Sequence, residues 1–162
     1  KEKEYFLLIL GGPTKHYDYS NENILNIFNL FNDLVKKNNL QGIVVPSIRT
    51  PKDIISLSKN KLGSNSLIID KVDKKAYLSA LSLAKYIAIT CDSISMISEA
   101  ALTGKPIYVA DIPTKKNDYR IKKFKELFTK LNIIKKLDNE LETWHYEILD
   151  ETSRIANVIK KN

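Results

Sequence analysis

Short apolar runs alternate along the chain with longer stretches in which apolar residues recur every three or four positions. Continuous apolar runs of strand length are typical of strands buried on both faces, and the longer stretches are typical of helices with one buried face. We therefore expect strands at residues 5–10, 42–45, 66–69, 86–90 and 106–109. We expect helices at residues 21–38, from 51 onward, and at 74–85, 94–102, 121–131 and about 151–160.

The order of these elements, strand followed by helix throughout, predicts parallel strands joined by right-handed crossovers. The fold class is therefore a doubly wound, Rossmann-like α/β sheet of five or six parallel strands with helices on both faces. Neither a repeat nor a low-complexity linker interrupts residues 1–162, so we expect one domain. Thr50 is expected to cap the second helix, with Pro51 at its first position, and Gly104 to close the fourth.

The net charge of +7 comes almost entirely from lysine. Arginine, which can bind phosphate or guanine through two parallel hydrogen bonds, occurs only at Arg49, Arg120 and Arg154. The lysines are scattered along the predicted helices, a distribution typical of a solvated surface. We expect no nucleic-acid partner, whereas peripheral contact with a membrane or with a lipid-linked acceptor stays open.

The chain has no apolar run near the ~20 residues of a membrane span, and residues 1–13 lack a signal-peptide layout. Its single cysteine, Cys91, excludes an internal disulfide and fits a reducing compartment, so we expect a cytoplasmic protein. Cys91 ends a buried strand and is expected to be packed rather than nucleophilic. Because His16 and His145 lack metal-ligand spacing, we expect no metal, and no cofactor is expected.

Three turns at the carboxyl edge of the predicted sheet, where ligands of such folds bind, carry unusual residues. The first is Gly11-Gly12-Pro13-Thr14-Lys15-His16. Paired glycines let backbone amides approach a phosphate, and Lys15 adds a positive charge. A tight turn without a ligand explains the same residues equally well.

The second turn opens the fourth helix, where three polar residues crowd a start that one cap would satisfy: Asp92, Ser93 and Ser95. Free amides and the positive end of the helix dipole form an anion site there. Glu99, one turn further, reaches the mouth of this site and suits the hydroxyls of a ribose. The alternative is a well-capped helix in which Glu99 only favours the dipole. By itself Met96 is typical of a core residue.

The third turn holds Ser47 and Arg49 after the second strand. Arg49 either faces the site or pairs with a surface carboxylate, and the sequence favours neither.

Residues 11–17, 47–51, 90–100, 104–106, 144–147 and 151–155 together resemble the mitochondrial-fission ELM-type family. That family includes plant members linked to mitochondrial fission and many bacterial members, and it is often labelled a predicted nucleoside-diphosphate-sugar epimerase. The resemblance spans nearly the whole chain and is most specific over residues 92–106. Two positions depart from the family pattern: Ile48 replaces an expected second arginine, and Lys75-Ala76-Tyr77 replaces Asn-Pro-Tyr.

The same segments are similar, more broadly, to the carboxyl-terminal domains of GT-B glycosyltransferases. That resemblance implies that a diphosphate lies against Gly11, Gly12, Ser93, Ser95 and Met96. It also implies that Glu99 holds a ribose and that the turn around Val72 touches the base. His16, Ser47 and Arg49 form the rim of this expected site. The acceptor and the catalytic base of such proteins come from an amino-terminal domain, so we expect that domain as a partner and the chain alone to be inactive.

Our interpretation is a domain that binds a nucleoside-diphosphate-sugar donor as half of a GT-B glycosyltransferase-like protein, with its catalytic residues unknown. Two alternatives stay open: an epimerase on the same fold, and a non-catalytic scaffold that recruits partners.

Overall fold

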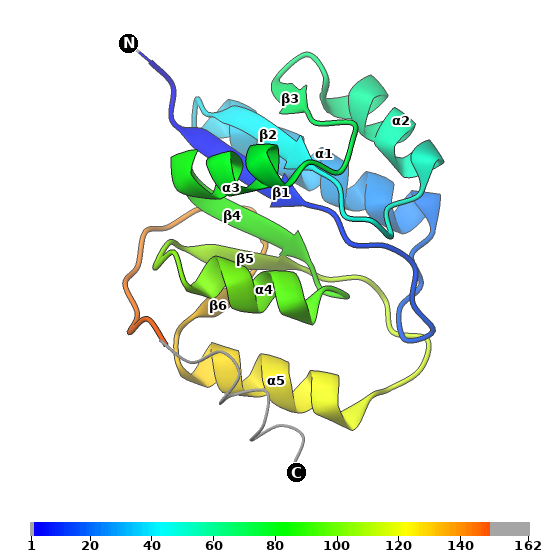
Figure 1. Cartoon of the computed structure of the whole chain (residues 1–162), viewed down its shortest axis with the longest axis vertical. Helices are drawn as coiled ribbons and strands as arrows, with labels where there is room; N and C mark the ends of the chain where they lie inside the picture. Colours follow the sequence, from blue (N-terminus) through cyan, green and yellow to red (C-terminus); the bar gives the residue numbers. More distant parts are fainter. Residues whose placement is uncertain (1, 150–162) are drawn as a thin grey trace.

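The computed structural model describes residues 2–149 and arranges six parallel strands of that range in one sheet, in the order β3-β2-β1-β4-β5-β6 (Figure 1). The elements, in chain order, are β1 (Tyr5–Ile9), α1 (Asn21–Lys37), β2 (Gln41–Val45), α2 (Lys52–Leu62), β3 (Ser66–Ile68), α3 (Lys74–Leu83), β4 (Ala84–Thr90), α4 (Ile94–Ala101), β5 (Ile107–Ala110), α5 (Tyr119–Lys130) and β6 (Ile134–Lys136). The strand order reverses between β1 and β4, as in doubly wound folds. The predicted fold class is confirmed.

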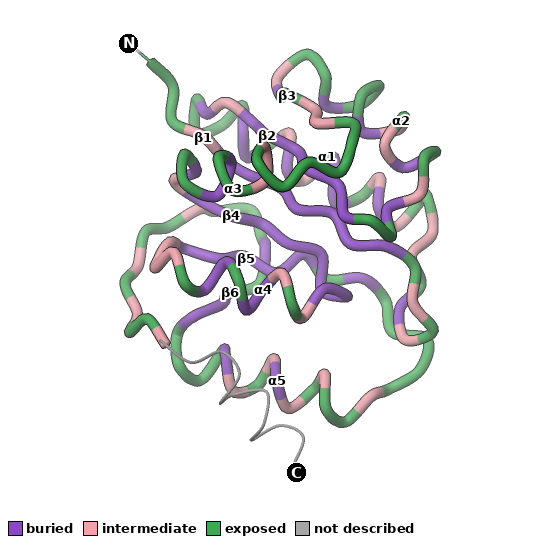
Figure 2. The backbone as a smooth tube through the Cα atoms, in the orientation of Figure 1, coloured by how far each residue is buried: buried purple, intermediate pink, exposed green. Residues whose placement is uncertain are grey.

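The sheet separates two helical layers, with α1 and α2 behind it and α3 and α4 in front of it in the view of Figure 1. The central strands are buried along most of their length, and exposed residues lie on the outer sides of the helices, in the turns and at single positions of the edge strands β3 and β6 (Figure 2). Phe6 of β1 packs on Phe31 of α1 with ring centroids 4.6 Å apart. The core therefore lies on both faces of β1 and β4, and it fixes the carboxyl ends of these two strands.

Helix boundaries follow local capping chemistry. The side chains of Ser20, Asp73 and Asp118 accept hydrogen bonds from first-turn amides of α1, α3 and α5. Gly104, as expected, lies just beyond α4 with a φ of +72°, a conformation that costs glycine little. No helix within residues 2–149 is both long and apolar enough to cross a bilayer.

Two local predictions were wrong, and one strand was not located. Thr50 does not cap α2, whose cap is Pro51 with no side-chain hydrogen bond, because the Thr50 hydroxyl binds backbone groups of the β1 turn instead. The third helix ends at Leu83, and Ala84 begins β4, since pairing with β1 draws this residue into the sheet. β6 went unrecognised because two of its three residues are lysines.

The segment after β6 returns across the sheet edge and packs on it. Trp144 meets Tyr108 of β5 edge-on, with ring centroids 5.1 Å apart, and its indole N–H donates to the carbonyl of Asn132 at 2.7 Å. The Tyr146 hydroxyl donates to the carbonyl of Lys105 at 2.7 Å. The helix expected at residues 151–160 lies outside the described residues.

Thr50 links two turns of the carboxyl edge, since its hydroxyl donates to the Gly11 carbonyl at 2.6 Å and accepts from the Ser47 amide at 2.9 Å. Thr50→Val keeps the shape but leaves the buried Ser47 amide without its acceptor, and the Gly11 carbonyl keeps only the Tyr19 hydroxyl as a donor, at 3.2 Å. We therefore expect it to lower the free energy of unfolding by about 1–3 kcal/mol in urea titrations. The control is Thr129→Val, at an exposed site where the hydroxyl bonds within its own helix, with an expected change below about 0.5 kcal/mol. Equal stability of the two variants would contradict a linking role for Thr50.

Candidate functional site

The turns after β1 and β4 meet at the point where the strand order reverses, which is where ligands bind in open α/β sheets. The Gly11 amide donates to the Thr90 hydroxyl at 2.9 Å, and the Gly12 amide donates to Asp92 Oδ2 at 2.9 Å. The structure thus brings together the first two turns singled out in the sequence. Both glycine amides have protein acceptors, so a phosphate at this turn would compete with Thr90 and Asp92.

The Asp92 carboxylate is fully buried and also forms an ion pair with Arg49 of the third turn. Arg49 Nη2 lies 3.1 Å from Asp92 Oδ2, and Arg49 Nη1 donates to the Gly12 carbonyl at 3.0 Å. Among the described residues, no group donates to Asp92 Oδ1. The expected alternative of a surface carboxylate is wrong, because Arg49 pairs with a buried one, and 40% of its side chain stays accessible where it lines a pocket.

The glycines of the first turn are required by close approach rather than by a positive φ. A Cβ at Gly11 would overlap the Asp92 carboxylate, and a Cβ at Gly12 would overlap the backbone of Arg49. Larger residues would therefore push apart the three turns that meet here. In this structure the two glycines allow the three turns to pack against one another.

A pocket of about 400 Å³ opens beside this junction, between the ends of β2 and β3 and the starts of α3 and α4. This volume lies within the ~300–1,000 Å³ typical of small-molecule sites. Its walls come from four segments: residues 45–49, Ile69 with residues 71–74, Tyr77 with Leu78, and the α4 face of Ser93, Ser95, Met96 and Glu99. Of the sequence-predicted residues, Ser47, Arg49, Val72, Ser93, Ser95, Met96 and Glu99 line it.

Glu99 is held by a residue of α3 that sequence reasoning did not include in the site. The Tyr77 hydroxyl donates to Glu99 Oε2 at 3.0 Å. Burial, followed by the nearby Glu99 carboxylate, raises the pKa of Tyr77 well above that of a free tyrosine, so the hydroxyl keeps its proton and acts as a donor. The carboxylate is thereby oriented in the wall of the pocket, with Oε1 as its second acceptor.

The start of α4 lacks a side-chain cap. Ser93 occupies the cap position without a capping hydrogen bond, and the neighbouring Asp92 side chain is committed to the β1 turn instead. First-turn amides without a side-chain acceptor and the positive end of the helix dipole therefore face the pocket side of Ser95 and Met96. Met96 is half-buried, in contact with both the core and the pocket, whereas Ile97 is fully buried.

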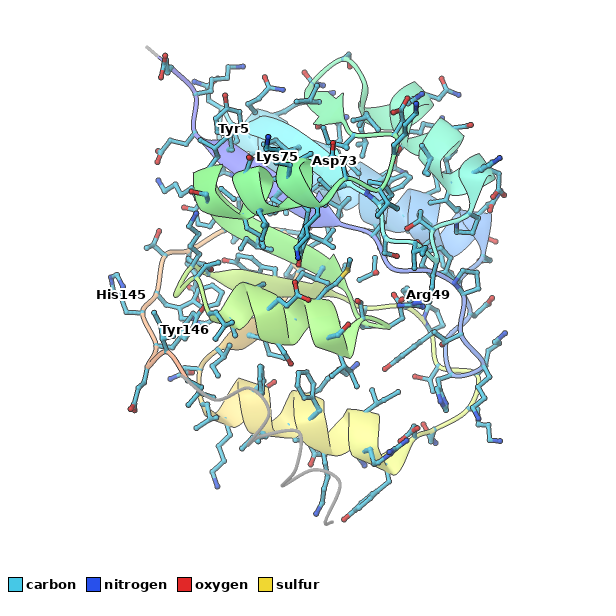
Figure 3. All side chains as sticks on the ribbon, in the orientation of Figure 1. Tyr5, Arg49, Asp73, Lys75, His145 and Tyr146 are labelled. Atoms are coloured by element: carbon cyan, nitrogen blue, oxygen red, sulfur yellow. The ribbon has the colours of Figure 1, made fainter. Side chains whose placement is uncertain are left out.

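The remaining predicted residues lie elsewhere. Lys15 is exposed and lines neither this pocket nor a second one that contains His16. Figure 3 shows His145 pointing outward on the side of the view opposite Arg49. Cys91 is buried as expected, and this burial raises the pKa of its thiol to about 11, so it is packed as a thiol. In residues 2–149, no group of three or more His, Cys, Asp or Glu side chains is arranged to hold a metal.

Tyr77 and Thr90 are the site residues that sequence analysis missed. Tyr77 carried one usable signal, since it is the one residue of the segment 75–77 that keeps the Asn-Pro-Tyr pattern of the family. Thr90 carried none, because a threonine at the end of an apolar strand is ordinary in a sheet.

Comparison with known proteins gives a consistent family and fold. The family model described as mitochondrial fission ELM1 matches residues 1–162. Protein RP120 of Rickettsia prowazekii (strain Madrid E) is 32% identical over 166 residues, which cover 98% of this chain and 46% of that protein. Mitochondrial fission protein ELM1 of Arabidopsis thaliana is 27% identical over 120 residues, covering 71% of this chain and 28% of that protein. The chain thus spans less than half the length of these relatives.

The fold is also similar to that of a UDP-GlcNAc 2-epimerase from Methanocaldococcus jannaschii, solved in complex with UDP-GlcNAc and UDP. The TM-score is 0.61 at 15% sequence identity, with 99% of this chain and 46% of the epimerase chain covered. At that identity the likeness concerns the fold alone. The match of the family model over the whole chain, together with the Rickettsia relative, shows that this chain belongs to the mitochondrial fission ELM1 family.

Proposed function

We propose that this chain binds the nucleoside-diphosphate part of a nucleotide sugar in the pocket between α3 and α4, as the donor-binding half of a GT-B glycosyltransferase-like protein. The observation that carries the proposal is an oriented carboxylate and an uncapped helix start in the walls of one pocket. A nucleoside diphosphate needs both, because its ribose hydroxyls are donors and its phosphates are acceptors.

The diphosphate is assigned to the start of α4. Backbone amides and the hydroxyls of Ser93 and Ser95 are neutral donors for its oxygens, and the helix dipole favours the negative charge. Arg49 lines the same pocket, and its guanidinium is held by Asp92 and Gly12, so its position is set before a ligand arrives. Fixed donors of this kind also stabilise a departing diphosphate.

The ribose is assigned to Glu99 and the base to the apolar side of the pocket. Ile48 and Val72 are exposed by 89% and 62%, and both line the pocket. Such apolar surface is favourable against the face of a base, while backbone groups of the turn at residues 70–72 can contact its edge. This arrangement selects a planar aromatic group attached to a ribose without specifying which base.

The remaining predicted residues have two roles, one behind the pocket and one on its solvent side. Gly11, Gly12 and Asp92 act behind the pocket by holding Arg49 and the α4 start in place. Lys15 is an exposed cation on the same turn that can approach a phosphate from the solvent side. The acceptor and the catalytic base are assigned to an amino-terminal domain of the whole protein, so the isolated chain is expected to bind without turnover.

Two other functions have specific support. An epimerase is favoured by the likeness in fold to a UDP-GlcNAc 2-epimerase. A non-catalytic scaffold is favoured by the family, and by the exposed apolar side chains Ile48, Val72 and Leu78 around the pocket. Binding of nucleoside diphosphates separates the scaffold from the two enzymes, and turnover of a nucleotide sugar by the full-length protein separates the enzymes from each other.

The first experiment is a calorimetric titration of the chain with UDP, GDP, ADP and CDP, each beside its 2′-deoxy form. Saturable binding of at least one ribonucleotide, weakened for its 2′-deoxy form, is the expected result. Absence of binding by every member would refute donor binding and leave the scaffold.

Glu99→Gln should weaken binding of the preferred ribonucleotide by about tenfold, since hydrogen bonds to a charged group contribute roughly 1.5–3 kcal/mol. Its effect on the 2′-deoxy form should be smaller, because that ligand already lacks one donor. Glu126→Gln removes the same charge from an exposed position on α5 and serves as the control. Equal losses for ribo- and deoxyribonucleotides would show that Glu99 does not contact the ribose.

Tyr77→Phe removes the hydroxyl that orients Glu99 while keeping the ring. We expect a loss of about threefold in ribonucleotide affinity, the size of one neutral-donor hydrogen bond. If Tyr77 acts through Glu99, the same change should have no further effect in a Glu99→Gln background. Tyr119→Phe, at an exposed site, is the control. Additive effects in the double variant would assign Tyr77 a separate contact.

A further inference from the structure

A second pocket, of about 230 Å³, lies between the turn after β1 and the segment that joins β5 to α5. The geometry points to this pocket as a binding site for a phosphate group, separate from the nucleotide pocket. It is independent of the proposed function, because no residue that lines one pocket lines the other. Its principal side chains are His16, Tyr17, Lys116, Asp118, Lys122 and Lys125.

The walls of this pocket are fixed by backbone pairing between segments about a hundred residues apart. Tyr17 and Thr114 form an isolated antiparallel bridge, and the two segments run side by side in Figure 1. The His16 carbonyl accepts from the amides of Lys115 and Lys116 at 2.7 and 3.2 Å, and the Asp18 amide donates to the Pro113 carbonyl at 2.8 Å. A preformed pocket loses little entropy when a small ligand binds.

The charge around the pocket is predominantly positive. Three ammonium side chains line it, those of Lys116, Lys122 and Lys125, against the carboxylate of Asp118 in the lining and that of Asp111, whose Oδ1 lies 3.9 Å from Lys125 Nζ. Asp118 is already engaged as the cap of α5, where Oδ1 accepts from the Arg120 amide at 2.8 Å, while Oδ2 lies 3.4 Å from His16 Nε2. The concave wall concentrates the lysine field, which attracts a small anion more strongly than a flat surface would.

The donors match the oxygens of a phosphate. Lys125 Nζ lies 3.4 Å from the Tyr17 hydroxyl and 5.4 Å from the centre of its ring, which holds the ammonium at the wall of the pocket. Burial, with smaller contributions led by Cys91, raises the pKa of Tyr17, so its hydroxyl stays protonated and accepts a hydrogen bond from Lys125. The Thr114 hydroxyl and the Asn117 amide line the same space as neutral donors.

The size of the pocket limits the ligand. A volume of about 230 Å³ lies below the ~300–1,000 Å³ usual for sites that enclose a drug-sized molecule. Lysine ammonium groups are common phosphate ligands that act as point charges. A phosphate group fits both properties, either as free inorganic phosphate or as the terminal group of a phosphorylated compound whose remainder stays outside.

The test is titration of the 162-residue chain with inorganic phosphate, and separately with a phosphate monoester such as methyl phosphate, followed by amide chemical shifts in NMR. Saturable shifts should centre on residues 16–17 and 114–125. Binding of inorganic phosphate alone would assign the site to the free ion, and binding of both would assign it to a phosphate group on a larger compound. Absence of saturation with both ligands, or shifts centred on α4, would overturn the proposal.

Two matched double variants on α5 separate binding in the pocket from general attraction to positive surface charge. Lys122→Gln with Lys125→Gln should weaken phosphate binding by about tenfold, because two charge-assisted contacts are lost. Lys123→Gln with Lys130→Gln removes the same charge from the same helix at positions that do not line the pocket, and it should change the affinity less than twofold, about the effect of screened surface charge. Equal losses in the two doubles would overturn the proposal in favour of nonspecific attraction.

Discussion

The buried carboxylate of Asp92 is the group on which the arrangement of the carboxyl edge depends. It is fully removed from solvent, and one of its oxygens accepts both the Gly12 amide and the Arg49 guanidinium. A buried charge is tolerated only when it is paired and hydrogen-bonded, so three turns from different parts of the sequence must meet at this point. The glycines follow from the same constraint, because a Cβ at Gly11 or Gly12 would occupy the space of these partners.

Residues near this junction line both pockets: Ser47 and Arg49 line the larger one, and His16 and Tyr17 line the smaller one. Since the Asp92 side chain turns toward β1, it does not cap α4, and the first turn of that helix remains directed at the larger pocket. Arg49 is held in the same wall by the same carboxylate. Four residues beyond Gly12, the chain reaches His16 and the lysine-lined pocket beside α5. The buried core of the edge and the walls of its pockets are therefore built from the same short turns.

Membership of the ELM1 family and a doubly wound fold narrow the function without deciding it, because one fold hosts many activities. What distinguishes this chain is the chemistry of one pocket, where an oriented acceptor, Glu99, and uncapped donors, at the start of α4, lie in walls that also offer apolar surface. That combination is the reason for preferring nucleoside-diphosphate binding over a role as a scaffold alone. The chain covers 46% of its Rickettsia relative.

Much of the fold was predictable because its signals are local. Apolar runs marked five strands, helical spacing marked the helices, and the alternation of the two implied the sheet and its parallel direction. The turns that meet at the carboxyl edge were predictable for the same reason, since parallel strands bring their carboxyl ends to one side. β6 was missed because three residues with two lysines carry no apolar pattern, and pairing with β5 alone makes them a strand.

The sequence by itself therefore determined the fold class, the family resemblance and the segments that form the candidate site. Only the tertiary structure decided the partners within that site. It assigned Thr50 to the β1 turn rather than to a helix cap, placed Arg49 on a buried carboxylate, and set Tyr77 against Glu99. These contacts join residues 22 to 43 positions apart, and they depend on strand order and helix crossing. Such distances between side chains have no periodic or local signature, because they arise only when the elements pack.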